Sequence, residues 1–282
     1  FAPLGNLIIG LLGVGVAYKS GFLNSLFKMI SEKVPRKFLT FLVVLLGIIF
    51  SMFYEVGYVI LIPLAAILFM NLGRHPSAGI CAAFSGITFG YGANVIINRL
   101  DSMLTLYSGK ASKVLDSAYN VNLYGNIIFT AISMILVAYV GMVVTEKFII
   151  PKLGKYYFDE EEPSQDGVPS IFKETNIGLF IVASLSELIN KFQFTGLLLV
   201  VVTFLVVAIS TFFVPMASTK WAMMSPVIVP MFMQSSMTPE FAEAVFRAAD
   251  SSVKGLTPIF SYFVILIGFL HIYNKRKNDV IT

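Results

Sequence analysis

The sequence has few of the residues that build metal centres and covalent crosslinks. Its 282 residues include one cysteine, Cys81, and two histidines, His75 and His271. A single cysteine forms no internal disulfide, and this set of ligands rules out a convincing zinc or iron–sulfur cluster. Neither histidine shows the spacing to a nucleophile that would suggest a catalytic triad. The sequence therefore predicts a protein without a metal or other cofactor, and it predicts no enzyme activity.

Charged residues are also scarce. They make up 13% of the chain, whereas 57% of the residues are hydrophobic; soluble domains carry about 25% charged residues. This balance predicts a polytopic protein of the lipid bilayer. The net charge of +4 does not indicate nucleic-acid binding, because much of it lies between Lys19 and Lys37 and at Lys275–Lys277, beside apolar runs, as membrane topology favours.

The N-terminal segment lacks the pattern of a signal peptide. The chain begins with Phe1, no basic segment precedes the first apolar run, and no small-residue cleavage site follows it. We therefore expect the chain to be a piece of a longer protein. The basic, amphipathic segment 22–37 suits a helix at the membrane interface, and a solvated loop helix is the alternative.

Long apolar runs predict the membrane spans. The run over 38–72 is too long for one crossing of about 20 residues, so we interpret it as two spans that meet near Tyr54–Gly57. Further spans are expected over 123–144, 195–214 and 258–273. The polar segment 159–175 begins with an acidic run and is interpreted as a soluble linker.

Gly73–Asp101 is apolar at both ends, but its centre is small, polar and rich in glycine. Each half is too short to cross a bilayer alone. A re-entrant helical hairpin with its tip near Gly90–Asn94 fits this pattern, because glycine lets backbone approach a ligand closely. An ordinary span packed through its glycines is the alternative.

A second unusual stretch runs from Thr211 to Pro258. It continues an apolar run, yet it holds helix breakers, hydroxyls and charges at Pro215, Ser218, Thr219, Lys220, Trp221, Pro226, Pro230, Arg247 and Asp250. Lipid-exposed backbone must satisfy its own hydrogen bonds, so no ordinary spanning helix would carry so many of them. Secondary transporters build substrate sites from broken helices near the bilayer midplane. We interpret the stretch as a broken helix that forms half of such a site.

The two stretches each pair a hairpin-like segment with a following acidic residue, as an inverted structural repeat would. The predicted fold is an all-α polytopic membrane protein, an inverted-repeat secondary transporter with two re-entrant hairpins and broken transmembrane helices. We place the first repeat at 1–158 with a hairpin near 76–100, and the linker at 159–175. The second repeat is placed at 176–282 with a hairpin near 205–233.

The segment after Ser236 predicts a helix with a charged face. Thr238 is expected to be its N-cap with Pro239 at the first helical position, and Gly255 should end it. Arg247 and Asp250 lie three residues apart and therefore share a face of this helix.

Two interpretations of this face remain open. In the first, Arg247 holds a substrate carboxylate with its planar fork, while Asp101 and Asp250 carry a coupling proton or bind a coupling cation. In the second, Glu243 and Lys254 form ordinary solvated pairs with Arg247 and Asp250 on a surface helix. Trp221, the only tryptophan, similarly suits either an interfacial anchor or a ring that stacks on an aromatic substrate.

Several motifs agree in order and spacing with those of a known family. They are GVGVAYKSG (13–21), GYVILIPLAAILF (57–69), GRHPSAGI (73–80), GYGAN (90–94), STKWAMMSPVIVPMF (218–232) and FRAADSS…TP (246–258). Together they resemble the p-aminobenzoyl-glutamate transporter family (AbgT).

The resemblance implies a homodimeric carrier in the inner (cytoplasmic) membrane, driven by H⁺ or Na⁺, that moves p-aminobenzoyl-glutamate or sulfonamide-like antimetabolites. The site positions of the family fall here on Asp101, Ser218, Trp221, Pro239, Arg247, Asp250 and Pro258. Asn94 and Thr219 join them from the two predicted hairpin tips. The expected substrate-binding residues are therefore Asn94, Ser218, Thr219, Trp221, Pro239, Arg247 and Pro258, and the expected ion-coupling residues are Asp101 and Asp250.

The sequence also departs from the family pattern. After Ser252 the family usually has a Thr-Asn pair, where this chain has Val253 and Lys254. The exchange removes a polar ligand and adds a positive charge, so the cargo can differ. A carrier of the same fold for another carboxylate such as a dicarboxylate, a membrane-embedded hydrolase and a scaffold that does not transport are the alternatives.

Overall fold

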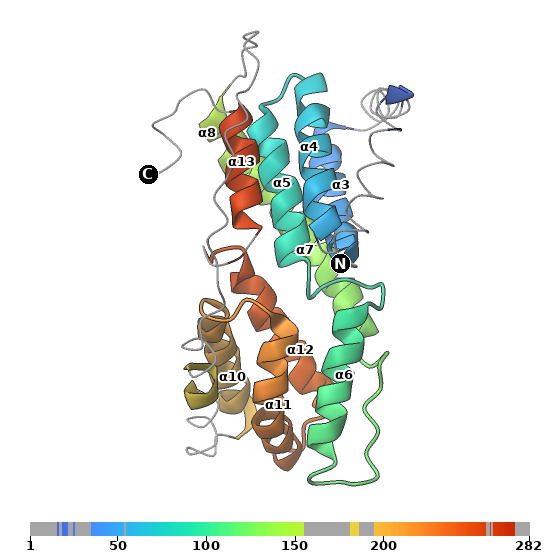
Figure 1. Cartoon of the computed structure of the whole chain (residues 1–282), viewed down its shortest axis with the longest axis vertical. Helices are drawn as coiled ribbons and strands as arrows, with labels where there is room; N and C mark the ends of the chain where they lie inside the picture. Colours follow the sequence, from blue (N-terminus) through green and yellow to red (C-terminus); the bar gives the residue numbers. More distant parts are fainter. Residues whose placement is uncertain are drawn as a thin grey trace. The chain divides into compact units, whose positions relative to one another are not determined.

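The computed structural model describes residues 35–53, 55–154, 181–185, 195–257, 260 and 262–273, with a few isolated residues before them. This described part contains helices and turns and no strand, which confirms the all-α prediction. The chain forms two compact units (Figure 1). The first comprises Phe1–Tyr91, Met134–Ser170 and Ser261–Thr282, and the second comprises Gly92–Ser133 and Ile171–Phe260.

The first unit is built around α5 (Pro76–Phe89), which packs against α3 (Arg36–Phe50), α4 (Glu55–Asn71) and α13 (Phe263–Tyr273). A 3₁₀ turn at Ser51–Phe53 separates α3 from α4. The run over 38–72 therefore forms two apolar helices with the predicted break between them.

Glycines allow α3 and α5 to approach each other closely. A Cβ atom added to Gly86 of α5 would lie 2.4 Å from the Val44 carbonyl oxygen of α3 and 3.1 Å from the Gly47 Cα. Gly79 lies equally close to α4, with 2.4 Å between its added Cβ and the Ala65 carbonyl oxygen. Small residues at such contacts let apolar helices gain packing contacts between their backbones.

The Gly86→Ala substitution is expected to destabilise the first unit by about 1–3 kcal/mol, because the added methyl group forces α3 and α5 apart. The measurement is the thermal unfolding midpoint of the purified protein. Gly109→Ala in α6 (Arg99–Ser112) is the matched control, because an added Cβ there meets nothing within 4 Å. Equal unfolding midpoints for the two variants would contradict the packing argument.

One helix in the described part is long and apolar enough to cross a membrane, and it runs from Ile127 to Leu153. It consists of α7 (Ile127–Val144), a π-helical turn (Thr145–Ile149) and α8 (Ile150–Leu153). At about 1.5 Å per residue it exceeds the roughly 30 Å hydrocarbon core. Apolar side chains such as Ile128 and Ile132 are exposed on it, as lipid contact requires. A helix of suitable length and composition thus covers most of the span expected over 123–144, and it extends further than predicted.

Arg74 and Glu146 form an ion pair in the first unit. Sequence analysis does not predict this pair. The Arg74 guanidinium donates to both carboxylate oxygens of Glu146 at 2.7 and 3.0 Å and to the Thr40 hydroxyl at 2.9 Å. Both charged side chains are mostly buried. The pair links the end of the long helix to the start of α5 and satisfies charges that would otherwise lie among apolar helices.

The second unit consists mainly of α6, α10 (Gly196–Thr211), α11 (Ala217–Gln234) and α12 (Pro239–Lys254). The α11 helix packs against α6 and α12, and α12 packs against α10. Shorter apolar helices in the described part include α10 and the core helices of the first unit, whereas α6 and α12 are polar and are not among them.

The broken helix expected after Thr211 is only partly present. The α11 helix continues through Pro226 and Pro230, and the backbone leaves helical geometry at 212–216 and 235–238 instead. A proline removes one donor and crowds one turn, which tertiary packing can accommodate. The re-entrant hairpins, the inverted repeat and the repeat boundaries remain predictions. The acidic linker, Pro258 and most of the predicted interfacial helix lie outside the described residues.

Candidate functional site

The α12 helix is positioned by its caps. The Thr238 side chain accepts a hydrogen bond from the Phe241 amide at 3.2 Å, Pro239 occupies the first helical position, and Gly255 follows the last turn. These caps confirm the predicted start and end of the helix. Satisfying the terminal amide groups fixes where the helix begins, and this fixes which residues face α6, α10 and α11.

The charged face of α12 is buried. Four side chains on this face recur at helical spacing and are each 5% exposed or less: Glu243, Arg247, Asp250 and Lys254. The interpretation of α12 as a surface helix with solvated pairs is therefore wrong. The error has a physical cause, since intrahelical spacing alone looks the same whether the face meets water or another helix.

Asp101 is held from two sides. Its Oδ2 accepts a hydrogen bond from the Asn98 amide at 2.7 Å, which closes a capping box at the start of α6. Its Oδ1 accepts from Nη2 of Arg247, so the carboxylate joins α6 to α12. The capping hydrogen bond orients the carboxylate towards Arg247. The ion pair brings together two predicted site residues from distant parts of the sequence.

The segment after Tyr91 lies directly on α12. The Gly92 amide donates to the Ser251 hydroxyl at 2.9 Å, and the Arg247 Nη1 donates to the Gly92 carbonyl at 3.5 Å. A Cβ atom at Gly92 would clash with the Ser251 hydroxyl and lie 3.0 Å from the Arg247 carbonyl oxygen, so a larger residue would force a shift of both groups. The close backbone approach at Gly92 is to α12, and the predicted approach to a ligand stays a prediction. The neighbouring Asn94 is buried, and its side chain accepts from the Ile96 amide at 3.0 Å.

A second buried ion pair lies deeper in the unit. Asp250 accepts from the Lys220 ammonium of α11 and from the Thr211 hydroxyl of α10, the latter at 3.3 Å. Its other oxygen lies 3.5 Å from the Lys254 ammonium. One carboxylate is therefore placed between two ammonium groups. Such charges are stable in an apolar unit only because each has an opposite charge beside it.

The formal charges of this cluster cancel only when Glu243 is ionised. Among the described residues of the unit, the buried cations are Lys220, Arg247 and Lys254, and the buried anions are Asp101, Asp250 and Glu243 when it is ionised. With Glu243 protonated, the cluster carries one excess positive charge. The arrangement is then complementary to an anion.

Trp221 is fully buried within the second unit. Its Nε1 donates to the Ser108 hydroxyl of α6 at 2.9 Å, and its ring packs on Phe246 of α12 with 4.6 Å between ring centres. An indole enclosed in this way is not an anchor at the lipid headgroups. Trp221 instead ties α11 to both α6 and α12, and any aromatic ligand would reach it only after these helices move.

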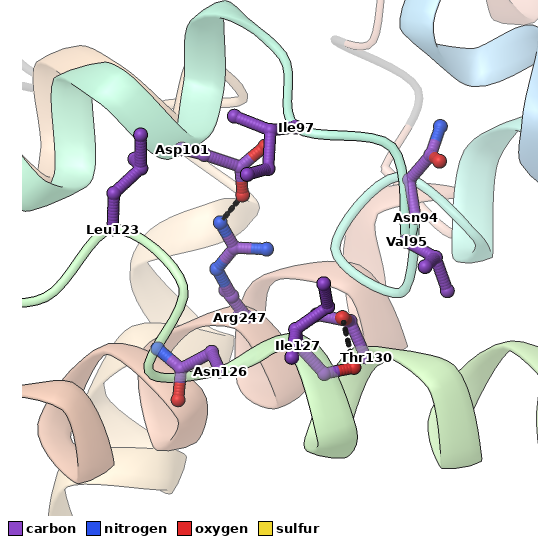
Figure 2. A pocket seen from close by; sticks show the side chains of 9 residues that line it. All are labelled: Asn94, Val95, Ile97, Asp101, Leu123, Asn126, Ile127, Thr130 and Arg247. Carbon is purple, nitrogen blue, oxygen red and sulfur yellow. Dashed lines mark hydrogen bonds and ion pairs between the residues drawn. The ribbon is translucent and has the colours of Figure 1, made fainter.

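A cleft in the second unit holds part of the predicted site (Figure 2). Figure 2 shows the Arg247 guanidinium pointing towards Asp101, with Asn126 beside it. The lining residues are Asn94, Val95, Ile97, Asp101, Leu123, Asn126, Ile127, Thr130 and Arg247. The space of about 230 Å³ includes open solvent, so the cleft is a shallow hollow rather than an enclosed ligand site. It must therefore widen to enclose a ligand.

The other predicted residues lie apart from this cleft. Ser218 and Thr219 occupy the first turn of α11 and are half-buried, and the Thr219 hydroxyl faces the Met216 sulfur at 3.9 Å. Pro239 starts α12. Sequence reasoning missed Ser108 and Asn126, whose residue types and spacing carry no signal, because only tertiary packing brings them to Trp221 and Arg247.

Comparison with known proteins identifies the family. The model described as the AbgT putative transporter family matches residues 1–170 and 167–279. The p-aminobenzoyl-glutamate transport protein of Escherichia coli strain K12 is 24% identical over 374 residues, which cover 97% of this chain and 74% of that protein.

Solved structures share the fold. The YdaH transporter of Alcanivorax borkumensis, described as having an unusual topology, gives a TM-score of 0.72 at 22% identity, covering 98% of this chain and 79% of its own. MtrF of Neisseria gonorrhoeae, described with a class of antimetabolite efflux pumps, gives 0.70 at 27% identity, covering 98% and 76%. Since the family model matches nearly the whole chain, this membrane protein belongs to the AbgT putative transporter family.

Proposed function

We propose that the protein is an ion-coupled secondary transporter that moves p-aminobenzoyl-glutamate, or related aromatic carboxylates and sulfonamide antimetabolites, across the inner membrane. The observation that carries the proposal is the buried Arg247–Asp101 pair at the edge of a cleft, within a cluster that has more cations than aspartates. The E. coli relative is named for p-aminobenzoyl-glutamate transport and MtrF for antimetabolite efflux, which supports this cargo.

The ion pair gives Arg247 a partner that a substrate can replace. In this structure Arg247 pairs with the Asp101 carboxylate. A substrate carboxylate offers the same planar, bidentate partner and competes with Asp101 for the guanidinium. The guanidinium keeps a carboxylate partner throughout the exchange, so loading does not isolate the Arg247 charge in an apolar unit. The displaced Asp101 carboxylate retains its hydrogen bond from the Asn98 amide. Asn94 and the cleft residues would then contact the remainder of the substrate.

Asp101 and Asp250 are proposed to take part in ion coupling, with H⁺ or Na⁺ as the ion. Each is buried beside a cation, so its pairing responds to any change of charge nearby. Lys254 places a fixed ammonium at Asp250. The chain thus carries a tethered positive charge where the family usually offers a neutral amide.

Trp221 is proposed to recognise the aromatic ring of the cargo once the helices around it separate. Ser218, Thr219 and Pro239 lie at the starts of α11 and α12, where such a movement would expose them, and Pro258 is assigned by resemblance alone. The two re-entrant hairpins, the inverted repeat and the homodimer belong to the same proposal.

Trp221→Ala is expected to weaken binding of p-aminobenzoyl-glutamate at least tenfold while changing glutamate binding little, since only the former has a ring to recognise. Calorimetry on the purified protein measures both affinities. Trp221→Phe, which keeps a ring but removes the donor to Ser108, should fall between the native protein and Trp221→Ala. Equal losses of affinity for both ligands would show that Trp221 stabilises the fold and does not recognise the ring.

A dicarboxylate cargo is the second candidate, and the additional cation at Lys254 favours it. Competition between p-aminobenzoyl-glutamate and succinate for the purified protein separates the two proposals. Tighter binding of succinate would select the second. The transporter relatives argue against a membrane-embedded hydrolase, and turnover of a bound amide without any gradient would restore that alternative.

A further inference from the structure

Glu243 is a buried carboxyl group that the proposed mechanism does not yet use. It lies on the charged face of α12 and is 3% exposed. Its Oε2 accepts from the Asn126 amide at a long 3.3 Å, and its Oε1 has no partner in good hydrogen-bond geometry, although the nearby Ser108 hydroxyl lowers the pKa of the carboxyl group. A buried carboxylate with an unsatisfied oxygen is unstable as an anion, so this environment favours the protonated form.

The two aspartates of the cluster differ from Glu243 in this respect. Asp101 and Asp250 each contact a buried cation, and protonating either would leave that cation without its partner. Glu243 forms no ion pair with a described residue, so it can gain or lose a proton without breaking one. Of the buried acids in the described part of the unit, Glu243 is the one suited to titration.

The surroundings of Glu243 connect it to both parts of the site. Asn126, which bonds to the carboxyl group, also lines the cleft beside Arg247 (Figure 2). The Ser108 hydroxyl lowers the pKa of the same carboxyl group, and it accepts the hydrogen bond from Nε1 of Trp221. A change of charge at Glu243 is therefore passed to the cleft through one side chain and to the indole through another.

We propose that Glu243 takes up the coupling proton of the transport cycle, and that its charge state sets the affinity of the site for an anionic substrate. This inference rests on the proposed transport function and narrows its coupling ion to the proton. In this scheme Asp250 keeps its cation partners, and Asp101 exchanges with the substrate carboxylate at Arg247.

The charge balance gives the direction of coupling. With Glu243 protonated, the described buried cluster has three cations and two anions, and an anionic substrate neutralises the excess. With Glu243 ionised, the cluster is already neutral, and an anion binds less well. Substrate and proton therefore favour each other's binding, and the linkage must be reciprocal.

Burial and a few neighbouring groups set the pH range over which Glu243 titrates. Burial raises the pKa of Glu243 to about 7, with Ser108 lowering it, the charge of Glu240 raising it and Asn126 lowering it. The carboxyl group is then neutral below about pH 7 and ionised above it.

Two neighbouring charged groups already have partners. Glu240 accepts from the Tyr119 hydroxyl at 2.9 Å, and Lys220 of α11 is held by Asp250. The α10 helix carries no titratable side chain. The groups to consider around Glu243 are therefore Glu240 and Arg247 on its own helix, Asp101 on α6, Lys220 on α11 and Tyr119 between α6 and α7.

Trp221 offers a direct readout of this titration, because it is the only tryptophan in the chain. Ionisation of Glu243 adds a negative charge one hydroxyl group away from the indole and is expected to change its emission. The experiment follows the fluorescence of the purified protein without substrate from pH 5 to pH 9, a range that spans about two units on either side of neutrality. A His75→Gln/His271→Gln background removes both histidines from the titration.

The native titration is expected to have its midpoint near the pKa of about 7 and to vanish in Glu243→Gln. Two variants shift it in opposite directions. Glu240→Gln removes a negative neighbour and lowers the midpoint, whereas Asn126→Ala removes a hydrogen bond to the anion and raises it. A titration that persists in Glu243→Gln, or shifts of the wrong sign, would overturn the proposal, and the two shift variants keep the test informative if Glu243→Gln fails to fold.

Substrate binding provides the second measurement. The dissociation constant for p-aminobenzoyl-glutamate is expected to rise at least fivefold from pH 6 to pH 8 in the native protein and to stay constant in Glu243→Gln. If the native protein binds no such substrate, the proposed cargo fails while the fluorescence titration still tests Glu243. Identical pH dependence in the two proteins would overturn the coupling role.

Discussion

Replacing Arg247 with lysine is expected to weaken binding of p-aminobenzoyl-glutamate about 30-fold or more, equivalent to about 2 kcal/mol, and to abolish measurable uptake. Lysine keeps the charge but lacks the planar fork that matches a carboxylate. In the native protein this fork reaches Asp101 on α6 and the Gly92 carbonyl. The single ammonium group of a lysine cannot hold both partners and then exchange one of them for a substrate carboxylate.

The matched control is Arg99→Lys, because Arg99 lies exposed at the start of α6, close in sequence to Asp101. Binding is measured by calorimetry on both variants, and a thermal unfolding curve establishes that each is folded. Native affinity in folded Arg247→Lys would remove Arg247 from the substrate site and with it the exchange of carboxylates.

The Asp250→Ala variant is expected to lose about 3–5 kcal/mol of stability, because removing one partner of a buried ion pair leaves the other charge uncompensated. Two ammonium groups depend on this carboxylate, Lys220 and Lys254. They would repel each other in an apolar unit once it is gone. The thermal unfolding midpoint, measured in the same detergent for all variants, reports the loss.

A double variant separates the charge effect from the loss of packing. Adding Lys254→Met to Asp250→Ala removes one of the uncompensated cations and should recover part of the lost stability, whereas Lys254→Met alone should cost little because Lys220 still pairs with Asp250. Non-additivity of this kind is the signature of residues that interact directly. Additive effects in the double variant would show that Lys254 and Asp250 act independently.

Local features of the sequence were sufficient to predict the framework of the site. The Thr238-Pro239 cap, the Gly255 terminus and the break before α4 follow from residues that are neighbours in the chain, and all three are present. The role of Gly92 follows from a single physical property, the absence of a side chain. Predictions of this type succeed because the competing conformations are few and local.

The partners of the charged residues could not be obtained in the same way. Arg247 and Asp101 are 146 positions apart, and Arg74 and Glu146 are 72 apart. A cation can pair with any acid that tertiary packing brings to it, and spacing along one helix favours the wrong choice. Glu243 shows this most clearly, since its position four residues before Arg247 suggests a solvated pair, whereas burial gives it a different environment altogether.

Helix breakers were overinterpreted for a related reason. Pro226 and Pro230 lie inside α11 without ending it, because helix propensity is a weak local preference and the packing of α11 against α6 and α12 outweighs it. The cleft itself was beyond sequence reasoning, as Ser108, Asn126 and Thr130 have no pattern that distinguishes them from ordinary helix and loop residues.

The central claim is that the protein is an ion-coupled carrier of aromatic carboxylates, and flux into proteoliposomes tests it most directly. Labelled p-aminobenzoyl-glutamate is supplied with an imposed proton gradient, a sodium gradient or neither, for the native protein, Arg247→Lys and the Arg99→Lys control. We predict flux that requires the proton gradient, is retained in Arg99→Lys and is lost in folded Arg247→Lys. Flux that is indifferent to both gradients, or its absence from correctly folded native protein, would contradict the account.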